Sequence, residues 1–373
     1  MPASTLAKLQ ASLQKEYGEN SVVFATDIPR YEVVSSGSLV LDYITGIGGI
    51  PHNRVIEIVG KEGAGKTTLG LHIIKKFLER YPDKGAAICD MEHRITTSWV
   101  EDHIGPQLME RLILLWPDSA EQSTDMYTDC VKSNAVSVFM YDSIGGSPSQ
   151  RVTDKSATVG NIGGNALAMT RFAQFASIYS SKYNCLTICI NQIRDDMGGY
   201  NRLITPGGHG LKHAYSLRVE LKPGKDKFYD EIDGEKVQVG YNVVAKIVKN
   251  SLASPYRAAH YLFYFTPCKY GFGIDTLEET IRLGILTEVI RQGGRWYNHP
   301  LLPEGKVGSR DILIDCIRND QVLQDRIVSD ILEQLKKGNV QGISTTFDPD
   351  DEKDSAEDRL LSVGYVTESA VGI

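Results

Sequence analysis

No apolar run in the 373-residue sequence approaches the roughly 20 residues that a membrane-spanning helix needs. The N-terminal stretch also lacks the apolar centre of a secretory signal peptide. These absences argue against a membrane protein and against secretion. We therefore expect a cytoplasmic chain with no membrane partner.

Cysteine is sparse, and its spacing carries no metal or disulfide signature. The six cysteines form no CxxC pair, and the two closest, Cys185 and Cys189, lie in an apolar run. This arrangement is typical of reduced, buried thiols. A zinc site is not supported.

Positive charge is also in the minority, because the formal net charge is −7. That balance argues against attraction of the whole surface to nucleic acid, but it leaves room for a local basic groove. The hydrophobic fraction of 42% is enough for one large core and smaller modules, so we expect two or three domains.

Apolar, strand-like runs alternate with helical stretches from residue 54 onward. The clearest runs are residues 55–59, 86–90, 136–142 and 186–191. This alternation predicts an α/β fold with a mostly parallel sheet flanked by helices. Since each run ends in a polar or glycine-bearing turn, Lys66, Glu92, Asp142 and Gln192 should meet at the carboxyl edge of one sheet, where open α/β folds bind ligands.

The first of these runs leads directly into a glycine-rich loop and then into a helical stretch that includes Thr68. The loop consists of Gly60, Lys61, Glu62, Gly63, Ala64, Gly65, Lys66 and Thr67. This strand, loop and helix order is the context of a phosphate-binding P-loop. Backbone N–H groups and the helix N-terminus can surround the phosphates, Lys66 can reach the terminal phosphates, and the Thr67 hydroxyl can ligate magnesium.

Three polar residues at strand ends can complete such a site. Asp142 is the candidate second magnesium anchor, although an Asp at a strand end is also a common cap. Glu92 can polarise an attacking water, with a solvated surface acid as the alternative. The amide of Gln192 can sense a γ-phosphate and pass its state to the glycine-rich loop that follows, which is a switch hypothesis.

The N-terminal segment is predicted to form a short amphipathic helix over residues 4–17, with Ser4 or Thr5 as its N-cap, followed by a strand over residues 22–25. Taken alone, a helix packed on its own domain is favoured over an arm that contacts another subunit. Two stretches rich in small polar residues, 154–164 and 195–210, are predicted to be functional loops, with plain disorder as the alternative.

The C-terminal part is predicted to contain helices over residues 277–290 and 309–337 in a small α+β module, followed by an acidic, disordered run. His209 and His213 lie four residues apart, but the surrounding glycines do not favour a stable helix and no Glu completes a zinc-protease motif. Metal binding is not expected there.

Several of these motifs occur together, in an order and spacing that resemble the bacterial RecA family. They are residues 36–42, 60–67, 90–93, 142–143, 190–194 and 207–212. The resemblance extends from about residue 4 to residue 300. It implies ATP and Mg²⁺ as cofactors, and a helical filament of identical subunits on single-stranded DNA. Such a filament pairs that strand with homologous double-stranded DNA and exchanges strands with DNA-stimulated ATP hydrolysis.

The resemblance also implies roles for individual segments and residues. It divides the chain into an oligomerisation arm (1–33), a RecA-like ATPase core (34–269), a C-terminal module (270–340) and a disordered acidic tail (341–373). Both predicted loops would line the filament axis, with single-strand-binding and loading proteins as further candidate partners. The residues at family DNA-contact positions are Val159, Ile162, Arg194, Gly207, Gly208 and His209.

Other positions of the family pattern concern the adenine and the neighbouring subunit. Trp99 occupies the place of an aromatic residue against adenine, with a core tryptophan as the alternative. The family's two interface lysines, which reach the neighbouring γ-phosphate, are represented only by Lys249, since Ser251 replaces the second. Thr96 stands where the family has an acidic residue near the adenine, and His209 stands where it has an asparagine at the end of the second loop. These departures favour a phage-type or otherwise divergent recombinase.

Two alternative functions share the same motifs. A ring helicase of RecA fold would also use the P-loop, Asp142 and Gln192, although the glycine loop ending at Gly208 and the N-terminal arm disfavour it. A non-catalytic filament protein, in which ATP only gates DNA binding, is motivated by Ser251.

Overall fold

The structure is a computed structural model that describes residues 2–27, 32–146, 164–195 and 203–337. The chain divides into two units, Met1–Glu32 and Val33–Ile373, each with its own internal contacts. Within the described ranges, no helix combines the length and the apolar composition needed to cross a lipid bilayer.

The first unit contains α1 (Pro2–Tyr17) and the 3₁₀ helices η1 (Glu19–Ser21) and η2 (Ala25–Asp27). The helix begins earlier than predicted, because proline is well suited to a first helical turn. Ser4 and Thr5 therefore lie inside the helix, and the prediction that one of them is its N-cap is wrong.

The predicted strand over residues 22–25 is also wrong within the described chain. Val22 is extended, with φ −140° and ψ 120°, but no strand there pairs with it, and Ala25 begins η2. The Val22 carbonyl oxygen instead accepts hydrogen bonds from the side-chain amides of Gln10 (3.3 Å) and Gln14 (2.8 Å). A strand needs a partner for its backbone groups, and here helix side chains satisfy one of them.

The second unit is built around one sheet of nine described strands, in the order β13-β12-β11-β10-β3-β7-β6-β4-β5. Neighbours from β10 to β5 are parallel, whereas β10 to β13 pair antiparallel. The bounds are β3 Val55–Gly60, β4 Gly85–Asp90, β5 Leu112–Leu115, β6 Val136–Asp142, β7 Leu186–Gln192, β10 Leu217–Ile232, β11 Glu235–Asn250, β12 Ala258–Cys268 and β13 Gly271–Ile274. The predicted mostly parallel α/β sheet is confirmed.

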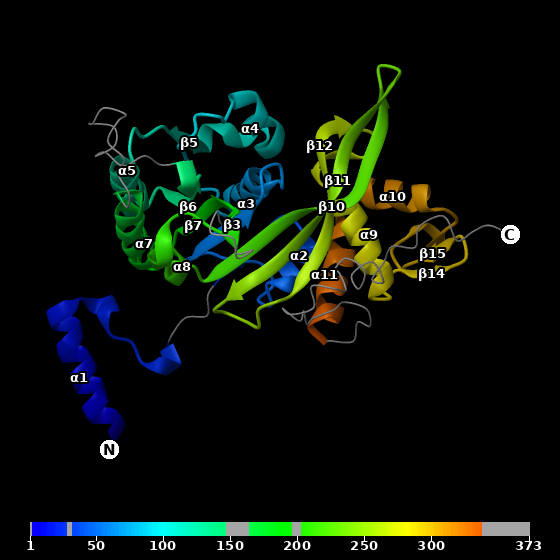
Figure 1. Cartoon of the computed structure of the whole chain (residues 1–373). Coiled ribbons are helices and arrows are strands. Elements are labelled where there is room, and N and C mark those ends of the chain that lie inside the picture. Colours follow the sequence, from blue (N-terminus) through cyan, green and yellow to red (C-terminus); the bar gives the residue numbers. More distant parts are fainter. Residues whose placement is uncertain (1, 28–31, 147–163, 196–202, 338–373) are drawn as a thin grey trace, which may run out of the picture. The chain divides into compact units, whose positions relative to one another are not determined.

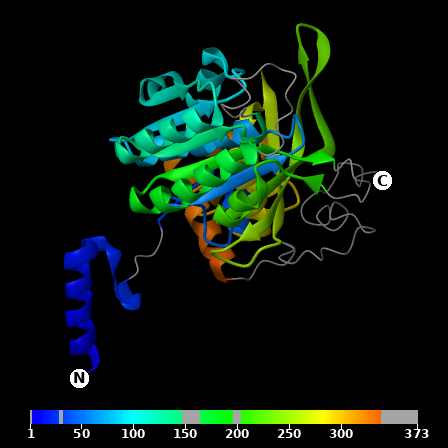
Figure 2. The same ribbon diagram turned by 60° about the vertical axis from the view of Figure 1, so that its left-hand side comes forward.

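Helices cover both faces of this sheet, because apolar side chains point to both sides of its central strands. On β3, Ile56 and Ile58 join the core that includes α3, whereas Val55 joins the core that includes α5 and α7. The helices of this part are α2 Leu39–Ile44, α3 Lys66–Arg80, α4 Thr97–Ile104, α5 Ala120–Lys132, α7 Gly164–Lys182 and α8 Gly208–Ala214. Figures 1 and 2 show the far ends of β10 and β11 as a ribbon that extends beyond the rest of the sheet.

Short elements complete the second unit. The small sheets pair β1 (Val33–Val34) with β2 (Ile50–Pro51), β8 (Arg194–Asp195) with β9 (Leu203–Ile204), and β14 (Arg291–Gly293) with β15 (Trp296–Asn298) and β16 (Lys306–Val307). The 3₁₀ helices are η3 Pro106–Arg111, η4 Ile144–Gly146 and η5 Pro303–Gly305.

The C-terminal part has its own apolar core, formed by α9 (Thr276–Leu286), α10 (Arg310–Asn319), α11 (Gln321–Lys337) and the residues between them (Figure 1). The predicted helix over residues 309–337 is interrupted at Asp320, which has extended backbone angles and accepts a hydrogen bond from Leu323 N at 3.0 Å. An aspartate in this role caps a new helix, so one predicted helix becomes two.

Two predictions concern loop segments. Residues 154–163 of the first stretch and 196–202 of the second lie outside the described residues. The part that follows Pro206 is α8, so the expectation that glycines prevent a helix around His209 and His213 is wrong. Gly207, with φ +102°, ends the preceding turn and leads into the helix, which is a position that suits glycine.

A buried carboxylate joins the C-terminal part to the core. Glu279 on α9 is 4% exposed, and it accepts hydrogen bonds from Ser38 Oγ (2.7 Å) and Leu39 N (2.8 Å) at the start of α2. Burial raises the pKa of Glu279 to about 8, and the bonds from Ser38 and Leu39 oppose that rise. The carboxyl group is therefore protonated in the folded protein at pH values where the unfolded chain has lost the proton.

This shift predicts that Glu279 makes stability fall as pH rises. The folded pKa lies above the unfolded value, so the stabilisation is complete below about pH 4.5 and is lost as pH rises towards about 8. Glu279→Gln keeps an acceptor for Ser38 but does not titrate. Between pH 5 and 8, the unfolding free energy of the wild type should fall by on the order of 4 kcal/mol more than that of the Glu279→Gln variant. Urea unfolding across this range measures the difference, and parallel pH profiles would contradict the assignment.

Candidate active site

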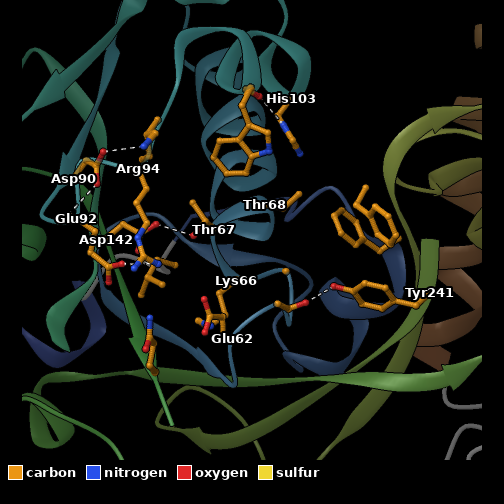
Figure 3. Close-up of a pocket in the computed structure, with 18 residues that line it drawn as sticks. Glu62, Lys66, Thr67, Thr68, Asp90, Glu92, Arg94, His103, Asp142 and Tyr241 are labelled. Carbon is orange, nitrogen blue, oxygen red and sulfur yellow. Dashed lines mark hydrogen bonds and ion pairs between the residues drawn. The ribbon is translucent and has the colours of Figure 1, made fainter. Parts of the chain in front are cut away.

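A cavity of about 600 Å³ lies at the carboxyl ends of β3, β4, β6 and β7 (Figure 3). Many of the residues that the sequence analysis selected line it together. They are Glu62, Gly63, Gly65, Lys66, Thr67, Thr68, Glu92, Trp99, Asp142 and Gln192. Gly60, Lys61 and Ala64 belong to the same P-loop but do not line the cavity.

The P-loop connects β3 to the N-terminus of α3. Gly65 is the N-cap residue of α3 and has left-handed backbone angles (φ 80°, ψ 20°), which glycine adopts without strain. Lys66 Nζ donates to the carbonyl oxygen of Lys61 at 2.8 Å, so its ammonium group lies across the loop. Burial lowers the pKa of Lys66, whereas Asp142, Glu62 and Glu92 raise it. The loop thus presents one buried cation beside the positive end of a helix.

Thr67 and Asp142 form the pair that the sequence predicted as metal ligands. Thr67 Oγ1 donates to Asp142 Oδ2 at 2.7 Å. Burial, together with the nearby acids Glu92 and Asp90, raises the pKa of Asp142 to about 6, against the opposing effects of Thr67 and Lys66. A carboxylate whose ionised form is disfavoured by burial and by neighbouring acids is stabilised by a cation. Carboxylate and hydroxyl oxygens are ligands that a hard cation such as Mg²⁺ prefers. The described residues hold no cluster of three His, Cys, Asp or Glu side chains for a metal, so ligand and water oxygens would supply the remaining contacts.

Glu92 lies beside this pair and is half-buried. Ser143 Oγ donates to its Oε1 at 2.7 Å, and Arg94 forms an ion pair with its Oε2 at 3.0 Å. Arg94 is 69% exposed, so this pair is weak and one oxygen of Glu92 can readily exchange its partner. Asp90 holds the turn itself, because its carboxylate accepts hydrogen bonds from Glu92 N and Ile95 N. The geometry leaves Glu92 able to hold a water at the cavity.

Gln192 ends β7 at the cavity, and the adjacent Asn191 ties it to the segment before α8. Asn191 Oδ1 accepts a hydrogen bond from Gln192 N at 3.0 Å. The Asn191 amide nitrogen donates to Glu57 Oε1 at 2.9 Å and to the carbonyl oxygen of Pro206 at 3.0 Å. Gln192 is therefore linked to Pro206 by its peptide bond to Asn191 and by the hydrogen bond from the Asn191 side chain to the Pro206 carbonyl oxygen.

Glu57 is fully buried in β3 and pairs with Arg218 of β10. Lys249, opposite Arg218 on β11, donates from Nζ to the carbonyl oxygens of Lys212 (2.7 Å) and His213 (3.3 Å) at the end of α8. Burial lowers the pKa of Lys249, as does Arg218, whereas Glu57 raises it. Lys249 does not line the cavity of its own chain.

The predicted DNA-contact residues are only partly described. Gly207 and Gly208 lie at the N-terminus of α8, with φ +102° and +73°. Arg194 lies in β8 and His209 in α8, but the structure describes the backbone alone at these two positions. Val159 and Ile162 lie outside the described residues.

Trp99 on α4 is half-buried and forms part of the cavity wall, packed against His103 at 4.8 Å between ring centroids. His103 Nδ1 lies 2.8 Å from the Trp99 carbonyl oxygen. Because a carbonyl only accepts, Nδ1 carries the proton. Burial lowers the pKa of His103, which favours the neutral ring, and in that form Nε2 is an acceptor.

Sequence reasoning missed the aromatic wall that also lines the cavity, made by Tyr241 of β11 with Phe263 and Phe265 of β12. These residues come from the antiparallel half of the sheet, far along the chain from the P-loop. The spacing of Phe263 and Phe265 is the available signal, since residues two apart on a strand share one face. The three rings provide an apolar surface of the kind that binds a planar base.

Comparison with known proteins gives one consistent family. The family described as the RecA N-terminal domain matches residues 4–270. Curated relatives named Protein RecA include that of Chloroherpeton thalassium, 30% identical over 350 residues that cover 92% of each chain. The Protein RecA of Thermus thermophilus is 31% identical over 87% of this chain and 92% of its own. That of Allochromatium vinosum is 31% identical over 94% of this chain and 98% of its own.

The buried pair of Glu57 and Arg218 generates a stability prediction. Arg218→Met leaves the carboxylate of Glu57 without its cation in a fully buried position, which should cost about 3 to 5 kcal/mol of unfolding free energy. Adding Glu57→Gln to this variant should restore much of the loss. Arg326→Met is the matched control, because its pair with Asp330 is exposed and should contribute less than about 1 kcal/mol. Equal losses in both single variants, measured by urea unfolding, would contradict the account.

Proposed function

Because the chain belongs to the RecA family, we propose that it is an ATP-dependent DNA recombinase that forms a helical filament on single-stranded DNA and exchanges it with homologous duplex. The observation that carries the proposal is the convergence of the P-loop, Thr67, Glu92, Asp142 and Gln192 on one cavity. These residues supply the positions that phosphoryl transfer from a nucleotide needs.

In this proposal the chain's own residues divide the work of hydrolysis. The P-loop N–H groups and Lys66 bind the phosphates, and the aromatic wall with Trp99 holds the base. Thr67 and Asp142 would hold Mg²⁺, which neutralises charge on the phosphate oxygens when bound. Glu92 exchanges one of its present partners for the attacking water and orients it.

Gln192 is the proposed link from nucleotide to DNA. Its amide would contact the γ-phosphate, and the hydrogen bonds of Asn191 connect that position to Pro206, directly before Gly207 and Gly208. Backbone N–H groups at these glycines and the guanidinium of Arg194 suit DNA phosphates and leave the bases free to pair. Val159, Ile162 and His209 complete the proposed DNA contacts, in which apolar side chains separate bases.

A second subunit would complete the site. Lys249 lies away from its own cavity, near the end of β11 and beside α8, and the exposed Ser251 lies two residues further along the chain. We assign Lys249 to the γ-phosphate of the neighbouring subunit, with α1 and the residues after it as the arm by which subunits join. The proposed segments remain the arm 1–33, the core 34–269, the module 270–340 and the acidic tail 341–373. Single-strand-binding and loading proteins are the further partners proposed for the filament.

Joint-molecule formation tests the proposed function. The full chain should convert single-stranded DNA and homologous supercoiled duplex into D-loops with ATP and Mg²⁺, and heterologous duplex should give none. Absence of joint molecules under conditions where filaments are visible by electron microscopy would reject strand exchange. Closed rings with directional unwinding would indicate a helicase instead.

Glu92→Gln tests the assignment of the water-polarising group. The amide keeps the size and the hydrogen bond to Ser143 but cannot draw a proton from water, so phosphate release should fall by about 100-fold or more while ATP still binds. Filaments on DNA should consequently persist longer after excess ATP is removed. Turnover at the wild-type rate in this variant would reject Glu92 as the catalytic residue.

Ser251→Lys tests whether the missing cation limits turnover. A second ammonium near a transferred phosphate stabilises the transition state, so DNA-stimulated phosphate release should rise by about tenfold. Ser251→Met is the matched control, because it has similar bulk without charge and should leave the rate unchanged. A rise in both variants, or in neither, would show that charge at this position does not set the rate.

A further inference from the structure

We propose that Tyr241 is a positioning residue that fixes the orientation of the Gly63 carbonyl group at the crest of the P-loop. This inference rests on the proposed nucleotide site and adds a residue that lies outside its sequence motif. The Tyr241 hydroxyl donates to the carbonyl oxygen of Gly63 at 2.5 Å, across 178 residues of chain (Figure 3).

The phenol is held in place by its neighbours. Tyr241 lies directly opposite Phe263 in the register of β11 and β12, and the two rings meet edge to face with centroids 5.7 Å apart. The centroid of the Phe265 ring, two residues further along β12, lies 5.8 Å from that of the Tyr241 ring. Since two rings restrict its rotation, the hydroxyl is already directed at the loop before any ligand binds.

Gly63 is a position where such a contact matters. It is exposed, its φ is +74°, and no atom lies within 4 Å of the point where a side chain would begin. Packing therefore does not restrain this residue, and glycine backbone can adopt several conformations at little cost. The hydrogen bond from Tyr241 is a restraint from outside the loop, in addition to the bonds that Ala64 N and Lys66 Nζ make to the Lys61 carbonyl oxygen.

The direction of this carbonyl affects anion binding. A P-loop binds phosphate because several N–H groups point inward, so a carbonyl that turned inward would place a negative end against the ligand. By binding the Gly63 oxygen, Tyr241 keeps the peptide between Gly63 and Ala64 from turning its carbonyl towards the ligand. The Ala64 N–H, on the other side of this trans peptide, then keeps its hydrogen bond to the Lys61 carbonyl oxygen at 3.3 Å. The loop then loses less conformational freedom when phosphate binds.

Tyr241 thus has two separate roles. The ring belongs to the aromatic wall, where it would contact the base, whereas the hydroxyl acts on the phosphate-binding loop. Tyr241→Phe removes the hydroxyl and keeps the ring. Tyr241→Leu removes both.

Binding measurements with fragments of the nucleotide test the proposal. Unlabelled ADP, inorganic tripolyphosphate and adenosine would each displace a fluorescent ADP analogue from the full chain. Tyr241→Phe should weaken ADP and tripolyphosphate by about fivefold, the effect of one neutral hydrogen bond, and leave adenosine unchanged. Tyr241→Leu should weaken all three. In ATP hydrolysis, Tyr241→Phe should raise KM with little change in kcat.

Tyr229→Phe is the matched control, because Tyr229 is an exposed tyrosine on β10 outside the cavity lining and the same atom is removed. Wild-type affinity for tripolyphosphate in Tyr241→Phe would overturn the inference, and so would an equal loss of adenosine and tripolyphosphate. A wild-type chain that binds neither ADP nor tripolyphosphate would instead reject the nucleotide site itself, and the inference with it.

Discussion

A fully buried carboxylate, Glu57, lies in the strand that leads into the P-loop, and the geometry around the cavity depends on its being neutralised. Arg218 supplies the charge from β10, and Asn191 donates a hydrogen bond from β7. These contacts hold three adjacent strands, β10, β3 and β7, in one register. Because a buried charge without partners is strongly unfavourable, a shift of any of the three strands would be costly. The P-loop and Gln192 are thus held at fixed relative positions.

The same network connects the nucleotide end of the sheet to the segment before α8. The Asn191 side chain accepts a hydrogen bond from Gln192 N and donates one to the Pro206 carbonyl oxygen, while Lys249 on β11 donates to carbonyl oxygens at the C-terminal end of α8. The segment directly before α8 is therefore contacted from the side of the proposed sensor, and the end of the helix from the proposed intersubunit side. In our proposal, α8 is the element through which nucleotide state and DNA contact influence each other, since both sets of contacts bear on one short helix.

The strands β3, β4, β6 and β7 follow from the sequence, because they are apolar runs that are buried almost throughout and each ends at a polar residue or a glycine-rich turn. The cavity residues Lys66, Glu92 and Asp142 were predictable for that reason. The antiparallel half was not, since the outer part of β10 alternates exposed and half-buried residues and β11 mixes buried and half-buried residues without a strict alternation. Tyr241 carries no local signal, because its role arises only when β11 pairs beside the P-loop. The predicted helix over residues 309–337 was wrong because Asp320 caps a new helix. The predicted strand at Val22 was wrong because no neighbouring strand pairs with it, and pairing cannot be read from a local sequence.

The central claim is that this cavity hydrolyses ATP and that DNA and a neighbouring subunit complete it. The most direct measurement is phosphate release from ATP by the full chain, with and without single-stranded DNA, over a range of protein concentrations. We predict that DNA stimulates release and that the rate rises more steeply than the protein concentration, because Lys249 of a second subunit is proposed to complete the site. A rate that is unaffected by DNA and strictly proportional to protein concentration would contradict it.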